Sequence, residues 1–155
     1  MDKINLIKQK TDELLKKMIN NFDLEVIEEN GVFNIVIKTK DEASTVIGRR
    51  GETIRALQKI LEVIFYKKFN EPVSILVNVN DYREKQKERL ESIVEQATNQ
   101  VKETKKPVFL KNLSSFERRI VHQMINEKYP ELVSHSEDFG KERRVIVELK
   151  KDKDE

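Results

Sequence analysis

The stretch Ile47-Gly-Arg-Arg-Gly51 is the part of this sequence that most constrains its fold, because two glycines three positions apart let the backbone turn tightly. They also let another molecule approach without a Cβ in the way. A helix that begins at Glu52 would point its free N–H groups and the positive end of its dipole at the turn. Arg49 and Arg50 would be displayed beside those groups, an arrangement that suits a phosphodiester backbone.

The residues on both sides of the turn predict two helices. A short helix is expected over residues 41–47, with Asp41 as its N-cap, and a longer amphipathic helix is expected over residues 52–69. A Gly-x-x-Gly turn that carries two solvated arginines between helices is also an ordinary structural feature. The turn alone therefore leaves both interpretations open, and its context has to be considered.

Further outward, the sequence predicts three strands and another helix. Asn30-Gly31 separates two β-rich runs, which is the pattern of a hairpin with a type I′ turn. The predicted elements are a helix over 6–22, hairpin strands at 23–29 and 32–38, and a half-buried strand at 73–79 after Pro72. Residues 1–80 are thus expected to follow the order α-β-β-α-α-β.

The second half of the sequence predicts two more helices and a strand. Ser114-x-x-Glu117 is a capping box, which indicates that a helix begins there. The expected elements are a long charged helix over 81–105 stopped by Pro107, an extended segment at 108–113, a helix from 114 to about 128, a polar loop over 134–141 and a closing strand over 143–149. Residues 150–155 are all charged and are expected to be a disordered tail.

Arg118 and His122 lie four residues apart on the helix that begins at the capping box. They point the same way, on a flank away from the centre of the apolar arc. That arc consists of Phe116, Ile120, Val121, Met124 and Ile125. Arginine offers a planar fork for phosphate, and histidine offers a ring for stacking or a hydrogen-bond donor. On this spacing alone, an ordinary surface pair with a partly buried histidine is the other interpretation.

The composition excludes several classes of protein. The 155 residues include 30 Lys and Arg and 28 Asp and Glu, a net charge of +2, so any nucleic-acid site must be a local patch. Cysteine is absent and histidine occurs twice, which excludes a disulfide framework and argues against a metal centre. No apolar run approaches the ~18 residues that span a bilayer, and no signal-peptide pattern is present. We therefore expect a cytoplasmic protein without membrane insertion and without a cofactor.

No pattern of catalytic residues is evident either. His135 lies between Ser134 and Ser136, but neighbours in a loop do not form a catalytic triad. The phosphate-binding pattern Gly-x-x-x-x-Gly-Lys-Ser/Thr is absent. The sequence therefore predicts a binding protein rather than an enzyme.

Two motifs in their contexts resemble known domains. The Gly48–Gly51 turn within the predicted α-β-β-α-α-β order resembles the KH domain in its bacterial, type II arrangement, whose GXXG loop clamps about four nucleotides. The block from Glu117 to His122 resembles the signature of the R-three-H domain, named for Arg-x-x-x-His. The two in tandem resemble the bacterial Jag family, also called SpoIIIJ-associated or KhpB proteins. The matching stretches are 47–58, 80–83, 107–110, 117–122 and 143–147.

The resemblance implies an α+β fold with two small units. These are a KH domain over 1–80 and an R-three-H domain over 81–150, followed by the tail 151–155. The expected RNA-binding residues of the first are Val46, Ile47, Gly48, Arg49, Arg50, Gly51 and Ile54, the apolar ones receiving bases. Those of the second are Arg118, Arg119, His122, Arg143 and Arg144.

The resemblance also implies a function and partners. It implies cytoplasmic binding of single-stranded RNA, a partnership with a small stand-alone KH protein of the KhpA type, and RNA-level control linked to cell envelope growth or division. Single-stranded DNA at the Arg-x-x-x-His face and a second copy of the chain are further candidate partners. The alternative is a protein-interaction adaptor, which has no need of Arg49 and Arg50 on an exposed turn.

Two features depart from the family pattern. Many members carry an extra N-terminal domain, whereas this chain starts directly at the first predicted helix, so we do not expect the functions of that domain here. Residues 136–140 are acidic, which is expected to weaken phosphate binding beside Arg143 and Arg144.

Overall fold

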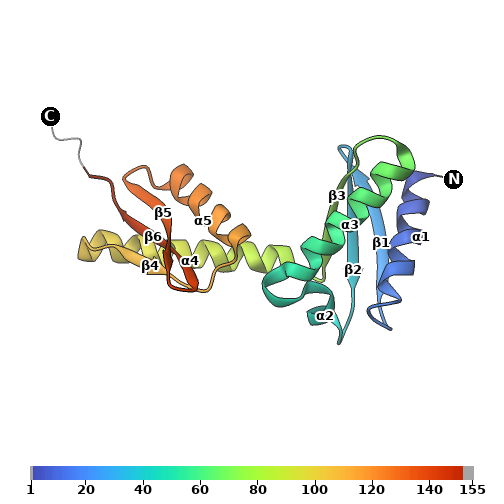
Figure 1. The fold of residues 1–155 in the computed structure, drawn as a ribbon, viewed down its shortest axis with the longest axis horizontal. Coiled ribbons are helices and arrows are strands. Elements are labelled where there is room, and N and C mark those ends of the chain that lie inside the picture. The colour runs from blue at the N-terminus through green and yellow to red at the C-terminus, as the bar shows by residue number, and fades with distance from the viewer. Residues whose placement is uncertain (1, 152–155) are drawn as a thin grey trace. The chain divides into compact units, whose positions relative to one another are not determined.

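The helices and strands form an α+β structure, as expected from the sequence (Figure 1). In this computed structural model, which describes residues 2–151, the chain divides into two compact units. The first ends at Arg83 and the second begins at Glu84. The division therefore falls three residues beyond the expected boundary, inside a long helix. The part of the predicted tail at residues 152–155 lies outside the described residues.

The first unit follows the predicted α-β-β-α-α-β order. Its elements are α1 (Lys3–Leu15), β1 (Asp23–Glu29), β2 (Val32–Lys38), α2 (Ala43–Ile47), a single 3₁₀ turn (Arg49–Gly51), α3 (Glu52–Phe69) and β3 (Ser74–Val79). Strand β2 pairs antiparallel with β1 and parallel with β3. Asn30 and Gly31 both have positive φ, 52° and 79°, as a type I′ hairpin turn requires.

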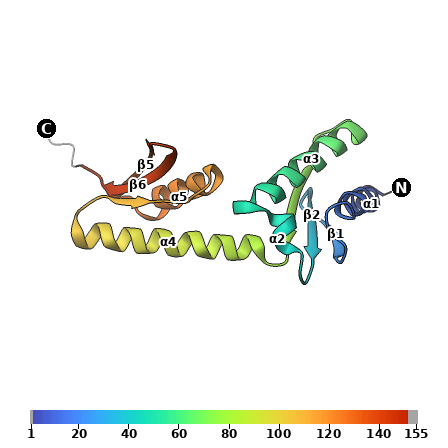
Figure 2. The ribbon, with the colours of Figure 1, turned by 60° about the horizontal axis from the view of Figure 1, so that its bottom comes forward.

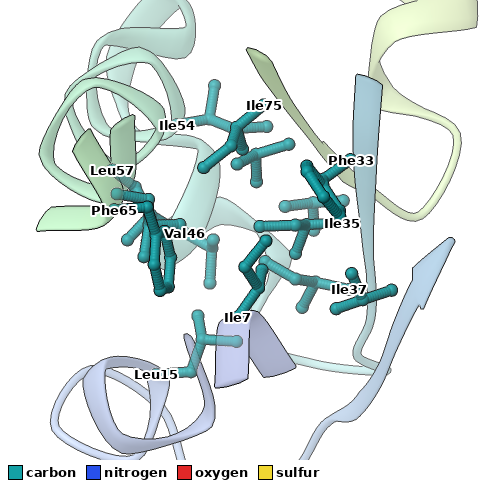
Figure 3. Packing of buried hydrophobic residues seen from close by; sticks show 14 of the residues in the cluster. Ile7, Leu15, Phe33, Ile35, Ile37, Val46, Ile54, Leu57, Phe65 and Ile75 are labelled. Carbon is teal, nitrogen blue, oxygen red and sulfur yellow. The ribbon is translucent and has the colours of Figure 1, made fainter. Parts of the chain in front are cut away.

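The core of this unit lies between one face of its sheet and its helices (Figure 3). Side chains alternate along a strand, so Phe33, Ile35 and Ile37 of β2 all face inward and are buried. Ile7 and Leu15 of α1 and Phe65 of α3 pack against the same cluster. Helices and sheet thereby bury one continuous apolar layer.

Two local predictions for this unit are wrong. Helix α1 ends at Leu15 rather than near residue 22. At this end of the helix, the backbone N–H groups of Met18 and Ile19 both donate to the carbonyl of Leu15. Asp41 is not the N-cap of α2; Glu42 occupies that position without a side-chain cap bond. The Glu42 carboxylate instead accepts hydrogen bonds from the backbone N–H groups of Asn20 and Asn21, at 3.0 and 2.9 Å.

The second unit combines two helices with a three-stranded antiparallel sheet in the order β4-β6-β5. Its elements are α4 (Tyr82–Thr104), β4 (Val108–Leu110), α5 (Ser115–Lys128), β5 (Leu132–Phe139) and β6 (Glu142–Leu149). Helix α4 is one continuous helix whose first two residues belong to the first unit (Figure 2). Val145 and Val147 of β6 share a core with α4 and α5.

The capping box of α5 forms as predicted: Glu117 N–H donates to Ser114 Oγ at 3.1 Å, and Ser114 N–H donates to Glu117 Oε2 at 2.9 Å. The predicted loop over 134–141 is wrong, because most of it is strand β5. Although its residues are mostly polar, β5 pairs along its whole length with β6. Pairing with a neighbouring strand overrides the local polar pattern.

Candidate functional site

The Gly48–Gly51 turn connects α2 to α3 through an unusual backbone. Gly48, Arg50 and Gly51 all have positive φ, at 72°, 53° and 75°. A Cβ at Gly48 would also lie 2.1 Å from Thr53 Oγ1 and 2.9 Å from Thr53 N. Position 48 therefore requires glycine both for its dihedral angle and for its close approach to α3.

The carbonyl oxygens of this turn accept hydrogen bonds from the protein itself. Gly51 N–H donates to Gly48 O at 3.3 Å, and Glu52 N–H donates to Arg49 O. The Arg55 guanidinium donates to Arg50 O at 2.9 Å. These bonds use the N–H groups of Gly51 and Glu52, so these two donors are not free as the sequence suggested. A phosphate at the turn would therefore depend on the guanidinium groups of Arg49 and Arg50.

Arg49 and Arg50 are exposed, and within residues 2–151 neither forms an ion pair. Their charges therefore remain uncompensated beside the turn, which favours a phosphate group there.

Two of the apolar residues expected to receive bases lie in the core instead. Val46 is 0% exposed and Ile54 is 1% exposed, and both point into the apolar cluster (Figure 3). Neither offers a surface to a ligand. Ile47 is half-buried and is the one of the three that retains exposed surface. The helical pattern does not distinguish a residue that faces the sheet from one that faces solvent.

His122 in the second unit is held between two serine side chains of β5. Its Nδ1 lies 2.7 Å from Ser134 Oγ, and its Nε2 lies 2.8 Å from Ser136 Oγ. The sequence missed these partners because it predicted a loop there. The available signal was the two-residue spacing of the serines, which places both on one face of a strand.

The pKa of His122 is lowered from its usual value, mainly by burial and further by the charges of His135, Arg118 and Arg143. The ring is therefore neutral at pH 7, with one donor and one acceptor nitrogen. Serine hydroxyls can complement either nitrogen, because they donate and accept. Arg118 is itself oriented by a 2.8 Å hydrogen bond to the carbonyl of Leu113.

The five candidate residues of the second unit do not form one cluster. Arg118, His122 and Arg143 are close enough to interact electrostatically, and Arg119 is exposed on α5. Arg143 pairs with Asp138 at 3.0 Å, in line with the expected effect of the acidic stretch. Arg144 does not lie with them: it pairs with Glu142, and its guanidinium carbon lies 4.8 Å from the centre of the Phe139 ring.

Within the described residues, no group of three or more His, Cys, Asp or Glu side chains is arranged to hold a metal ion. None of the helices in residues 2–151 has the length and apolar composition needed to cross a membrane.

Comparison with known proteins matches residues 88–149 to the R-three-H domain family. The chain is similar to the RNA-binding protein KhpB of Clostridium symbiosum, with 31% identity over 136 residues that cover 87% of this chain and 60% of that protein. It is 32% identical over 106 residues to KhpB of Lactiplantibacillus plantarum, covering 68% of this chain and 33% of that protein. It is 27% identical over 114 residues to KhpB of Bacillus subtilis, covering 73% of this chain and 55% of that protein. The chain thus spans between a third and three fifths of the length of these curated relatives.

Proposed function

Because this chain belongs to the Jag (KhpB) family and contains an R-three-H domain, we propose that it binds single-stranded RNA and catalyses no reaction. The observation that carries the proposal is the Gly48–Gly51 turn. There, two exposed arginines lie on a tight turn whose glycines let another molecule approach closely. We assign this turn the role of a KH-type loop that contacts the RNA backbone.

The R-three-H unit would supply a second contact through Arg118, His122 and Arg143. A neutral His122 can stack or donate one hydrogen bond, and Arg118 has further N–H groups beyond the one that binds Leu113. Arg143 has first to leave Asp138. We therefore expect the Gly48–Gly51 turn to supply most of the salt-dependent affinity.

The test is a charge reversal in the full-length chain. Arg49→Asp together with Arg50→Asp removes both cations, and aspartate tolerates the left-handed backbone of position 50. The matched control is Lys67→Glu together with Lys68→Glu, in the exposed last turn of α3. Binding to a fluorescent single-stranded RNA is measured by anisotropy over a range of salt concentrations, with circular dichroism as the check on folding.

The loop variant should bind more than tenfold more weakly, because each charge-assisted contact contributes about 1.5–3 kcal/mol. Its salt slope should fall by about 1.4, since each phosphate neutralised on a single strand contributes about 0.7. The lysine control should stay close to wild type. Equal affinities for the loop variant and wild type would contradict the proposal, as would equal losses in the loop and lysine variants.

A protein partner is the second candidate, and one feature of α3 favours it. Ile60, Val63 and Tyr66 are more than half exposed and are spaced by three residues, so they share one helical face. This face suits an apolar contact with a small KH protein or a second copy of the chain. Ile60→Glu with Val63→Glu should abolish such association in sedimentation experiments and leave RNA affinity unchanged. Unchanged association together with a loss of RNA affinity would exclude the adaptor role for this face.

The family also provides the physiological proposal. We propose that RNA binding by this chain serves RNA-level control linked to cell envelope growth or division. Sequencing the RNA crosslinked to the protein in cells tests this, and an absence of enrichment for envelope or division transcripts would contradict it.

A further inference from the structure

The first residue of α4, Tyr82, lies against the Gly48–Gly51 turn. A Cβ built at Gly51 would be 2.5 Å from Tyr82 Oη and 3.3 Å from Tyr82 Cζ, so the phenol head occupies the space that a side chain at position 51 would need. Tyr82 is itself half-buried and packs against the core of the first unit. Position 51 therefore has two reasons to be glycine, its φ of 75° and the tyrosine beside it.

The residue after Tyr82 ties this end of α4 to the first unit. Arg83 Nη2 donates to Gln58 Oε1 at 2.8 Å, and its Nε donates to Val77 O at 2.5 Å. Its backbone N–H donates to Asn78 Oδ1 at 3.2 Å. These bonds to α3 and β3 set the place of the first turn of α4, and with it the place of the Tyr82 ring.

The turn has a physical need for such support. Arg50 adopts a left-handed conformation that is costly for a residue with a Cβ, and such residues persist only where the surroundings hold them. Arg55 holds the Arg50 carbonyl from one side, through a 2.9 Å hydrogen bond. Tyr82 shares the position beside Gly51 with Arg55, whose Nη1 would lie 3.1 Å from a Cβ built there, and Tyr82 Oη is the nearer of the two at 2.5 Å.

We propose that Tyr82 is a positioning residue, which braces the Gly48–Gly51 turn in the conformation that binds phosphate. This inference rests on the proposed function of the turn. It extends the site to a residue of α4, beyond the region that carries the Gly-x-x-Gly motif. Tyr82 acts through the backbone of the turn and does not itself touch the RNA.

The test uses full-length variants. Tyr82→Ala removes the ring, Tyr82→Leu keeps an apolar side chain too short to reach Gly51, and Tyr82→Phe keeps the ring without the hydroxyl. The matched control is Tyr66→Ala, an exposed tyrosine on α3. Affinity and salt slope for single-stranded RNA are measured well below the melting temperature, and the amide resonances of Arg50 and Gly51 are followed by NMR.

Tyr82→Ala and Tyr82→Leu should bind about tenfold more weakly, the size expected when a strained conformation is no longer held. Their salt slope should stay at the wild-type value, because Arg49 and Arg50 are still present. The Arg50 and Gly51 resonances should shift or broaden. Tyr82→Phe should bind within about twofold of wild type, because it keeps the ring, whose Cζ lies 3.3 Å from where a Cβ of residue 51 would be.

Two results would overturn the inference while leaving the function of the turn intact. One is wild-type affinity in both Tyr82→Ala and Tyr82→Leu when the Arg49/Arg50 reversal weakens binding as expected. The other is a further loss when Tyr82→Ala is added to that reversal, since this would show a direct contact between Tyr82 and the RNA. If instead the reversal itself has no effect, the proposed function fails, and the NMR shifts still report whether Tyr82 braces the turn.

Discussion

Arg143 and Arg144 are adjacent in the sequence, yet they lie on opposite faces of the β4-β6-β5 sheet. Side chains alternate along a strand, so Arg143 shares a face with Val145 and Val147, which pack against the helices. Arg144 points the other way, over the ring of Phe139. Only Arg143 can therefore join Arg118 and His122 in a common contact surface.

Arg143→Ala should weaken nucleic-acid binding by the second unit, and Arg144→Ala should leave it unchanged. Asp138→Asn should strengthen binding, because it releases Arg143 from its ion pair. Anisotropy measurements in the background of the Arg49/Arg50 reversal isolate this contact. Equal effects of the two arginine substitutions would show that the separation into faces does not matter.

His122→Ala should destabilise the second unit by about 1–2 kcal/mol, because each hydrogen bond contributes about 0.5–1.5 kcal/mol. The helical wheel alone predicts almost no change, since it places His122 away from the apolar arc. The two serine contacts account for the difference. Urea denaturation measures it, with the exposed Arg119→Ala as control. A wild-type midpoint for His122→Ala would mean that the serines do not hold the ring.

Stability of the second unit should fall as the pH is lowered from 7 towards 5. Burial holds the pKa of His122 below its unfolded value, so the unfolded chain takes up a proton first. The stability is therefore complete above the unfolded pKa, near 6.5, and is lost as the pH falls towards the folded pKa. Between pH 7 and pH 5 the melting temperature should decrease less for His122→Asn than for wild type. Identical pH dependence in the two proteins would show that protonation of His122 is not the cause.

Glu117→Ala should destabilise the second unit by about 2–4 kcal/mol, and Ser114→Ala by about 1 kcal/mol. Glu117 is 1% exposed and both closes the capping box and pairs with Arg89. Glu117→Gln keeps an acceptor for the Ser114 N–H group, so its destabilisation should lie between those of Glu117→Ala and Ser114→Ala. Chemical denaturation ranks the three variants, and a larger loss for Ser114→Ala than for Glu117→Ala would contradict this assignment.

Single-stranded RNA should compete for the protein better than a duplex of equal length. A KH-type site needs bases that are separated from the stack, and a paired strand does not present them. A competition titration decides this. Equal competition by the duplex would show that binding is only electrostatic.

Local features of the sequence were sufficient for most of the elements. The Asn30-Gly31 turn has the positive φ values that its residues predict, and the capping box at Ser114 and Glu117 begins α5 as expected. These signals work because the relevant interactions join residues within a few positions of one another. The R-three-H assignment, too, follows from a short motif within α5 and the residues around it.

The tertiary structure decided what the local pattern cannot contain. Ser134 and Ser136 belong to a strand because β6 pairs with them, and only that pairing brings them to His122. Val46 and Ile54 have apolar side chains, which suit either a surface that receives bases or a core. Packing against the sheet places both in the core. Tyr82 meets Gly51 only after α4 is tied to β3 and α3 through Arg83. The sequence by itself thus determined most of the elements and the positions of the motif cations, whereas burial, the pairing of β5 with β6 and the support of the turn depend on contacts between residues that are distant along the chain.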